Sequence, residues 1–409
     1  MKLFEELKWR GLIKDVSNEE EIRRLLNEDK VSFYWGTDPS GDSLHIGHLS
    51  SLLLAKRLKD AGHHPILLVG GATGMIGDPR PTKERAMISV EAVEKNYKAL
   101  QKQIFDLFGY EMVNNYDWSK EINFIEFLRD YGKYFNVNYM LGKDIVRRRL
   151  ETGITYAEFS YMIMQALDFL WLYENKNVIL QVEGSDQWGN ITAGIDLIRK
   201  KLDKEALGFT MPLILDKDGN KFGKSEGNAL WIDKNKTSGY ELYQYLINTD
   251  DTMVIHYLKV FTFLSVSEIE EIEKRITNEP EKREGQQILA REIITFLHGK
   301  EEYDRALKIS EALFSGDIMR LDVKSIKEAF SNVPSFEIKE DTNILDLLVS
   351  ASICSSKREA REFIGNGAIN INDSKVDSIE LQVTKELTID GNIIVIRKGK
   401  KKYHLVKFI

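Results

Sequence analysis

Residues 31–53 read VSFYWGTDPSGDSLHIGHLSSLL and contain the pattern from which the fold follows. The apolar run Val31–Trp35 predicts a buried strand, and the Gly, Pro and Asp residues after it predict a turn. A helix is expected from about Leu44, with Asp42 or Ser43 as its N-cap. This order of strand, turn and helix is the repeating unit of a parallel α/β sheet.

The same alternation continues through the first half of the chain. Further strands are predicted at Ile66–Val69 and Val178–Val182, and helices at 90–108, Phe159–Glu174 and Gln187–Lys201. Apolar strands that alternate with helices favour a parallel sheet that is covered on both faces. The sequence therefore predicts a Rossmann-like, doubly wound α/β domain.

The pattern changes twice beyond this region. We expect a catalytic domain at 1–237, an all-helical domain at 238–320, a linker at 321–341 and a small α+β domain at 342–409. The linker prediction rests on the polar composition of that stretch and on Pro334.

Composition excludes several classes of protein. The 409 residues carry a formal net charge of −7, and Cys354 is the single cysteine, so neither a disulfide framework nor a cysteine-based zinc site is expected. The histidines show no metal-ligand spacing, and we predict no protein-bound metal. We see no signal peptide and no apolar run of about 20 residues, so we expect a cytoplasmic protein without a membrane span. Residues 342–409 hold eleven Lys and Arg against eight Asp and Glu, a weak hint of a nucleic-acid module.

The sequence His45-Ile46-Gly47-His48 is expected at a helix N-terminus that follows the first strand. Amides and the helix dipole attract anions there, and Gly47 lets a flat ring approach the backbone. Imidazole donors at this place suit the charge that builds during phosphoryl chemistry. Taken alone, the motif is as consistent with a surface helix that carries incidental histidines.

A second motif, Lys221-Phe222-Gly223-Lys224-Ser225, lies in a polar, glycine-rich stretch. Two lysines three residues apart on a loop can close over a polyphosphate and neutralise departing pyrophosphate. Most lysine-rich loops are simply exposed to solvent and bind no ligand, so this motif taken alone is also weak evidence for a phosphate site.

The predicted helix Phe159–Glu174 is apolar on all sides and is therefore expected to be buried. Its polar residues Tyr161, Gln165 and Asp168 share one face. A buried carboxylate requires a partner. The helix alone favours a structural polar network over a pocket for a small zwitterion with a hydroxyl at one end.

Together, these motifs resemble the His-Ile-Gly-His and Lys-Met-Ser-Lys-Ser signatures of class I aminoacyl-tRNA synthetases, in the same order. The resemblance extends from Met1 to Ile409 and is to the bacterial tyrosyl enzymes, through stretches such as Gly70–Pro79, Asn114–Trp118 and Gly184–Asn190. It implies that the protein activates tyrosine with ATP and transfers it to tRNA(Tyr). It also implies Mg²⁺ on the nucleotide, a homodimer, and catalysis by His45, His48, Lys221, Lys224 and Ser225.

The resemblance assigns the remaining site residues one by one. Tyr34 and Asp168 match residues at the substrate phenol; a pair built to bond a hydroxyl rejects phenylalanine, and tyrosyl-tRNA synthetases are the standard example of that rule. The positions matching the ammonium group, the carboxylate and the pocket wall are Tyr161, Gln165, Asp78, Gln187 and Gln181. Those matching the ATP and adenylate site are Gly36, Asp38, Ser40, His45, Gly47, His48, Asp186, Lys221, Lys224 and, for pyrophosphate, Lys83 and Arg85.

Two residues depart from the family pattern. Trp35 stands where many relatives have a small residue beside the ribose, and Glu183 stands where relatives often have glycine. Neither departure removes a group that the mechanism needs. The Trp35 ring can crowd the ribose or point away from it, and Glu183 can reshape its loop or add charge near the ammonium group, so the sequence leaves the nucleotide and tyrosine affinities open.

The last part of the chain resembles an S4-type RNA-binding domain. Lys357, Arg358 and Arg361 are expected on one helix face, with Lys400 and Lys401 beside them, at tRNA phosphates. Such contacts give salt-dependent affinity rather than sequence reading.

Three other functions are compatible with parts of the sequence. A tryptophanyl-type synthetase is disfavoured by Tyr34 and Asp168 together with the S4-like end. An RNA-binding protein on a decayed synthetase scaffold is disfavoured by the retained histidines and lysines. Another nucleotidyltransferase with His-x-Gly-His is disfavoured by the helical and S4-like parts.

Overall fold

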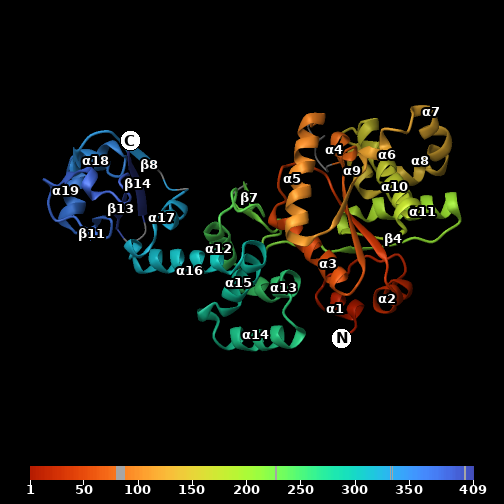
Figure 1. Cartoon of the computed structure of the whole chain (residues 1–409), viewed down its shortest axis with the longest axis horizontal. Helices are drawn as coiled ribbons and strands as arrows, with labels where there is room; N and C mark the ends of the chain where they lie inside the picture. Colours follow the sequence, from red (N-terminus) through yellow and green to blue (C-terminus); the bar gives the residue numbers. More distant parts are fainter. Residues whose placement is uncertain (80–87, 226–227, 332, 334, 400–401) are drawn as a thin grey trace. The chain divides into compact units, whose positions relative to one another are not determined.

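The computed structural model describes residues 1–79, 88–225, 228–331, 333, 335–399 and 402–409 (Figure 1). The chain forms two compact units. Unit 1 consists of Met1–Thr237 and Thr249–Leu289, and unit 2 consists of Ser238–Asn248 and Ala290–Ile409. No helix in the described part of the chain is long and apolar enough to span a membrane.

Unit 1 is built on a five-stranded sheet in the order β3-β2-β1-β4-β5. All four neighbouring pairs are parallel. The strands are β1 (Ser32–Thr37), β2 (His64–Val69), β3 (Glu111–Asn114), β4 (Val178–Gly184) and β5 (Leu207–Met211). The chain runs outward from β1 to β3 and then crosses back to β4, so the strand order reverses between β1 and β4. In an open α/β sheet, ligands bind at this switch point, at the carboxyl ends of the strands.

Helices cover both faces of this sheet, as predicted. In Figure 1, α3 (Leu49–Asp60) and α5 (Val90–Phe108) lie on one side, and α10 (Tyr156–Lys176) and α11 (Trp188–Leu202) lie on the other. The expected bounds of α5, α10 and α11 agree with these to within three residues, whereas the helix expected from about Leu44 begins at Leu49. The remaining elements of the unit's first 230 residues are α1 (Leu3–Trp9), α2 (Glu19–Glu28), α4 (Thr73–Ile76), α6 (Tyr116–Ser119), α7 (Phe124–Glu126), the π-turn Phe127–Tyr131, the 3₁₀ turns Gly132–Tyr134 and Ser185–Gln187, α8 (Val137–Leu141), α9 (Asp144–Leu150), β6 (Lys224–Ser225) and β7 (Asn228–Ala229).

The turn after β1 differs from the expectation. A 3₁₀ turn, Ile46–His48, precedes α3, and its N-cap is His45 rather than Asp42 or Ser43. The backbone N–H of Leu44 is held by Gln103 Oε1 and that of Ile46 by Leu230 O, at 2.9 and 2.7 Å. These contacts come from distant parts of the chain, so local capping preference did not reveal where the helix begins.

The segment 238–320 is divided between the units. Helices α13 (Asp251–Phe261) and α14 (Val266–Asn278) belong to unit 1, whereas α12 (Gly239–Ile247) packs on α16 (Lys300–Ser315) in unit 2. The boundary falls within α15 (Glu284–His298). Helices α12 to α16 agree with the predicted helical character of this segment, but the predicted bounds of an all-helical domain remain a prediction.

Unit 2 ends in a mixed sheet of order β11-β10-β13-β14-β8, in which β14 and β8 are parallel. Its elements are α17 (Val323–Ala329), β8 (Ser335–Ile338), β9 (Thr342–Asn343), α18 (Ile344–Ser350), α19 (Lys357–Gly365), β10 (Ile369–Ile371), β11 (Ser374–Lys375), β12 (Gln382–Val383), β13 (Ile393–Lys398) and β14 (Lys402–Phe408). The stretch 321–341, expected to be a linker, therefore contains a helix and a strand. Its apolar residues Ile326 and Phe330 are buried against β13 and β14, which polar composition alone did not indicate.

Candidate active site

The predicted site residues gather at the switch point. Tyr34 on β1 lies opposite Gln181 on β4, and the loop segments that follow these strands carry Asp38 and Asp186. Helix α10 supplies Tyr161, and the parallel neighbour β2 leads into the loop that ends at Asp78. The order of the strands thus places residues from four distant segments around one edge of the sheet.

One end of the site is deeply buried and polar. Tyr34 is 1 % exposed, and its hydroxyl has no hydrogen-bond partner among the described residues. Gln181 is 0 % exposed, and neither of its amide atoms reaches hydrogen-bonding geometry with a described residue, although the amide lies close enough to Glu183 to lower the pKa of that carboxyl group. A buried polar group without a partner costs about 1–3 kcal/mol, so such groups are expected where a ligand supplies the missing bonds.

Asp168 completes this buried end. Its two carboxylate oxygens accept hydrogen bonds from Asn115 Nδ2 and Trp118 Nε1, both at 2.9 Å. Burial raises the pKa of Asp168 to about 7, although the two hydrogen bonds act in the opposite direction. Asn115 and Trp118 lie in a motif that the sequence pointed to, but their role was missed, because more than 45 residues separate them from Asp168.

The opposite end of the site holds a chain of polar contacts. Asp38 accepts hydrogen bonds from Tyr161 Oη at 3.5 Å and from Thr73 Oγ1 at 3.1 Å. Asp78 accepts one from Gln187 Nε2 at 2.9 Å, and Gln187 Oε1 accepts another from Asn190 at 2.8 Å. Gln165, one turn along α10 from Tyr161, is only partly buried. Carboxylates at this end suit a cationic group of the ligand.

Glu183 lies inside the site rather than at its surface. It is 5 % exposed, and its Oε1 accepts a hydrogen bond from the Gly36 backbone N–H at 2.6 Å. Burial raises the pKa of Glu183, and the nearby carboxylates Asp186 and Asp38 add to this effect. Trp35 points towards the turn that carries His45 and His48. Its ring lies edge-on to that of His48, with the ring centroids 6.4 Å apart.

The backbone fixes the tautomers of the two histidines. The N–H of Gly47 donates to His45 Nδ1 at 3.1 Å, and the N–H of His45 donates to His48 Nδ1 at 3.3 Å. Each ring therefore carries its proton on Nε2. The rings stack with centroids 3.8 Å apart, and burial lowers the pKa of His48 to about 3. The imidazole of His48 is thus a neutral N–H donor at physiological pH.

The lysine segment lies against this turn. Gly223 has a φ of +84°, and a Cβ there would overlap the side chain of Ile46. A Cβ at Gly47 would come within 3.1 Å of the Phe222 carbonyl oxygen and 2.8 Å of the His45 ring. Glycine at both positions lets the two backbones touch.

The other residues predicted for the nucleotide site are exposed to solvent or lie wholly or partly outside the described part of the structure. Lys221, Ser40 and Asp186 are exposed to solvent. Lys224 and Ser225 form strand β6, but their side chains lie outside the described part of the structure. Lys83 and Arg85 lie outside the described residues altogether. Among the residues that are described, no three His, Cys, Asp or Glu side chains are grouped to hold a metal ion.

Comparisons with known proteins identify the family of this chain. A family profile described as "tRNA synthetases class I (W and Y)" matches residues 26–315, and one described as "Tyrosine--tRNA ligase SYY-like C-terminal domain" matches residues 325–406. The tyrosine–tRNA ligase 2 of Bacillus cereus (strain ATCC 10987 / NRS 248) is 51 % identical over 417 residues, which is 100 % of both chains. A tyrosine–tRNA ligase of Listeria monocytogenes serotype 4b is 50 % identical, also over 100 % of each chain.

The chain belongs to the class I tyrosyl-tRNA synthetases. Its activity is that of a tyrosine–tRNA ligase, with ATP as a substrate, as the sequence predicted. Among solved structures, a C-terminally truncated mitochondrial tyrosyl-tRNA synthetase of Aspergillus nidulans matches with a TM-score of 0.67 and 33 % identity, over 76 % of this chain and 94 % of that one. The predicted fold class and family are therefore confirmed.

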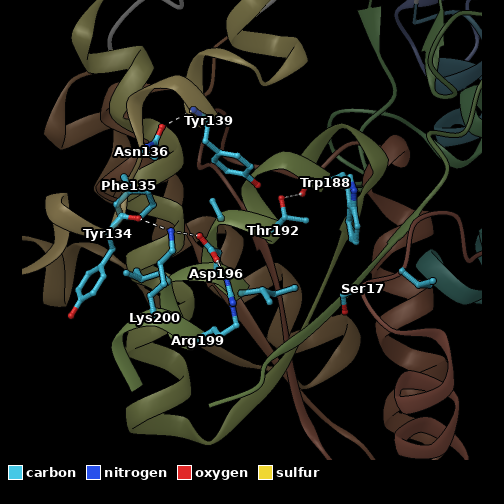
Figure 2. A pocket seen from close by; sticks show the side chains of 14 residues that line it. Ser17, Tyr134, Phe135, Asn136, Tyr139, Trp188, Thr192, Asp196, Arg199 and Lys200 are labelled. Atoms are coloured by element: carbon cyan, nitrogen blue, oxygen red, sulfur yellow. Dashed lines mark hydrogen bonds and ion pairs between the residues drawn. The ribbon is translucent and has the colours of Figure 1, made fainter. Parts of the chain in front are cut away.

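The synthetase also carries a pocket of about 560 Å³ beside α11 (Figure 2). Its wall includes the rings of Tyr134, Tyr139 and Trp188. Arg199 and Lys200, near the end of α11, border this pocket, but both are engaged: each forms an ion pair with Asp196 at 2.6 Å. Lys200 also donates to the Tyr134 carbonyl at 3.0 Å. These contacts favour a structural role at the helix end.

The predicted RNA-binding residues of the synthetase lie on α19. Arg358 and Arg361 are exposed, and Lys357 is paired with Asp346. Lys400 and Lys401 lie outside the described residues. Helix α19 begins at an N-cap, Ser356, whose side chain accepts from the Glu359 N–H, so the arginines project from a helix with a defined start.

Proposed function

We propose that Tyr34, Gln181 and Asp168 bind the phenol of tyrosine. The supporting observation is that the Tyr34 hydroxyl and the Gln181 amide are buried without partners beside a buried carboxyl group. Tyrosine brings a hydroxyl that both donates and accepts, whereas phenylalanine would leave these groups unpaired. Asn115 and Trp118 hold Asp168 in place and leave its remaining lone pairs for the substrate.

At the other end, Asp78, Tyr161 and Gln165 bind the ammonium group, and Gln187 lies near the carboxylate. The hydrogen bond between Asp78 and Gln187 supports this role, because it holds both groups in one place. Asp38 is tied to Tyr161 and Thr73, so it can contact the amino group or the ribose from a fixed position. These assignments make the pocket complementary to a zwitterion with a hydroxyl at its far end.

In the first step, the tyrosine carboxylate attacks the α-phosphorus of ATP, and the bond to pyrophosphate breaks. The carboxylate is already a nucleophile, so no general base is required. The Nε2–H groups of His45 and His48 donate to the phosphate oxygens as charge develops, and Lys221, Lys224 and Ser225 bind the departing pyrophosphate. The remaining contacts to the nucleotide come from Gly36, Ser40, Gly47, Asp186, Lys83 and Arg85. Magnesium bound to ATP supplies further screening of phosphate charge.

In the second step, a terminal ribose hydroxyl of tRNA(Tyr) attacks the carbonyl carbon of tyrosyl-adenylate. An ester bond forms, the anhydride bond to the phosphate breaks, AMP leaves, and the hydroxyl proton passes to the departing phosphate or to water. Arg358 and Arg361, with Lys357, Lys400 and Lys401, bind tRNA phosphates, and the exposure of the two arginines supports this role. Because tRNA is its substrate, we expect the protein in the cytoplasm.

We also propose that the protein is a homodimer. The helices between residues 124 and 156 expose large apolar side chains close together in sequence, which is the usual sign of a protein–protein contact. These side chains are Phe124, Ile125, Leu128, Val137, Tyr139, Leu150 and Tyr156.

The experiment for the site is exchange of labelled pyrophosphate into ATP, without tRNA, with tyrosine, phenylalanine or tryptophan. Exchange that depends on tyrosine alone is the expected result. Exchange that depends on tryptophan would mean that Tyr34 and Asp168 do not bind the phenol group of a tyrosine substrate. No exchange with any of the three, from folded protein with magnesium, would contradict the roles assigned to His45, His48 and the lysines.

A further inference from the structure

The two ATP-binding segments are joined through their backbones. Ile46 donates its N–H to Leu230 O at 2.7 Å, and Leu230 donates to Gly223 O at 2.9 Å. With the close approach of Gly47 to Phe222 O, these bonds fix the histidine turn to the start of the lysine segment. The position of Phe222 therefore sets where the lysines begin.

Phe222 is itself fixed by α13. Its side chain is 2 % exposed and stacks on Phe261 with ring centroids 4.5 Å apart. It also packs edge-on against the ring of Tyr257, with the ring centroids 4.7 Å apart. The Tyr257 hydroxyl in turn donates a hydrogen bond to Leu215 O at 2.9 Å. Lys221 is exposed beside it, so the segment alternates between a solvated lysine and a buried aromatic anchor. Aromatic pairs of this geometry contribute beyond their buried area.

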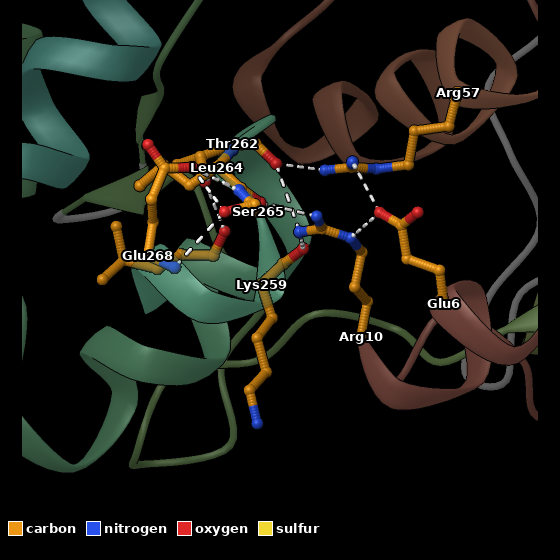
Figure 3. Close-up of polar contacts among 9 residues, drawn as sticks. Glu6, Arg10, Arg57, Lys259, Thr262, Leu264, Ser265 and Glu268 are labelled. Carbon is orange, nitrogen blue, oxygen red and sulfur yellow. Dashed lines mark hydrogen bonds and ion pairs between the residues drawn. The ribbon is translucent and has the colours of Figure 1, made fainter. Parts of the chain in front are cut away.

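The carboxyl end of α13 is held by two buried arginines (Figure 3). Arg10 donates to Lys259 O at 2.9 Å and to Leu264 O at 2.6 Å, and Arg57 donates to Thr262 O. Glu6 binds Arg10 at 2.7 Å and lies 3.9 Å from Arg57. Cations at a helix C-terminus satisfy carbonyls that have no partner within the helix.

These contacts form a closed ring, because Arg57 belongs to α3, the helix that starts directly after His48. The ring runs from the histidine turn along α3 to Arg57, then through Thr262 and α13 to Phe222, and back to Gly47. Two separate paths thus connect the histidines and the lysines: a direct backbone contact, and a rigid path through α13.

We propose that Phe222 and Arg57 are positioning residues for the ATP step, acting through α13 to set the lysine segment against the histidine turn. Neither touches the reacting atoms. Their influence is on ATP and pyrophosphate, and the tyrosine pocket between β1, β4 and α10 is outside the ring. This inference rests on the proposed function of His45, His48 and Lys221.

The test is the exchange assay on Phe222→Ala with ATP varied at saturating tyrosine, together with tyrosine binding measured by equilibrium dialysis without ATP. We expect kcat/KM for ATP to fall about 10- to 100-fold while the tyrosine Kd stays within twofold. Phe222→Met fills the same space with a flexible apolar side chain and is expected to stay within about threefold of wild type. The matched control is Ile22→Ala, which removes a buried side chain from α2, an element outside the contacts described above, and is expected to keep wild-type ATP kinetics.

Unchanged ATP kinetics in Phe222→Ala would overturn the inference, and so would an equal loss of tyrosine affinity. If Phe222→Ala does not fold, Phe222→Leu replaces it, with an expected loss of about 3- to 10-fold. A wild-type protein without tyrosine-dependent exchange would instead contradict the proposed function, so the two failures are distinguishable.

The double variant Arg57→Lys with Phe222→Leu tests whether both residues act through α13. Residues that act through one element give combined effects that are not the product of the single effects. We expect the loss in kcat/KM for ATP to be clearly smaller than that product. A loss equal to the product would show that Arg57 and Phe222 act independently and would overturn the path through α13.

Discussion

The two ends of the proposed active site, one for the phenol and one for the nucleotide, are built in opposite ways. At the phenol end, Tyr34 and Gln181 bring buried side-chain groups that have no partner among the described residues. At the nucleotide end, backbone bonds engage His45 and His48 and fix their tautomers, while Lys221 is solvated. The phenol end can therefore discriminate through desolvation, and the nucleotide end can accelerate through fixed donors. Selectivity and rate should accordingly respond to different substitutions.

The largest effect is expected at the nucleotide end. His48→Ala removes an Nε2–H donor that is held in place by the His45 backbone, and removal of such a donor slows a reaction about 10²- to 10³-fold. Pyrophosphate exchange should fall by this factor, with little change in tyrosine Kd. Because burial keeps the pKa of His48 at about 3, exchange should show no inflection from this residue between pH 5 and 8. A tyrosine Kd that rises as much as the rate falls would contradict the assignment of rate to the nucleotide end and of tyrosine binding to the phenol end.

At the phenol end, Asp168→Ala should act on binding instead. It leaves the Trp118 indole N–H without its acceptor and Asn115 Nδ2 with Thr73 Oγ1 alone, and it removes the proposed acceptor for the phenol, at a cost of about 1–3 kcal/mol. Tyrosine Kd, measured by calorimetry, should rise roughly 10- to 100-fold, with the ATP KM nearly unchanged. An unaltered tyrosine Kd would show that Asp168 is only structural.

The pH dependence of stability should come from the phenol end as well. Asp168 has a pKa of about 7 in the folded chain and an ordinary pKa of 3.8, so between these values the folded state holds a proton that the unfolded state lacks. Its contribution is therefore present at low pH and falls as the pH rises towards 7, by about 2 kcal/mol between pH 5 and 7. Urea denaturation of unit 1 should show this fall in wild type and a smaller one in Asp168→Asn. Equal slopes in both proteins would contradict the raised pKa.

The smallest effect on either end is expected from a change outside both. Arg358→Ala with Arg361→Ala removes two exposed charges from α19, so the slope of log affinity for tRNA(Tyr) against log salt should drop by roughly two. Exchange without tRNA should remain at the wild-type rate. A loss of exchange in this variant would show that the division of roles along the chain is wrong.

The sequence predicted the sheet and α10 well, because apolar strands and an all-apolar helix leave few alternatives. The bounds of β1, β4 and α10 came within three residues. The grouping of Tyr161, Gln165 and Asp168 also followed from helix geometry, but their roles came only with the family resemblance.

What the sequence did not predict depends on contacts between distant segments. Asn115 and Trp118 acquire their role from Asp168, and His45 becomes a cap because the chain near Leu230 binds its neighbour. The burial of Ile326 in a polar stretch likewise depends on strands that come later in the chain. Glu183 appeared as a departure from the family, yet only the structure places its carboxyl group on the Gly36 N–H.

The central claim is that the phenol end reads a hydroxyl, and the most direct test is the ratio of exchange kcat/KM for tyrosine to that for phenylalanine. Tyr34→Phe removes only the buried hydroxyl, so the ratio should fall about 5- to 10-fold relative to wild type, mainly through weaker tyrosine binding. The stability of the protein should not fall, because that hydroxyl has no partner among the described residues. An unchanged ratio would contradict the assignment of Tyr34, and with it the account of selectivity.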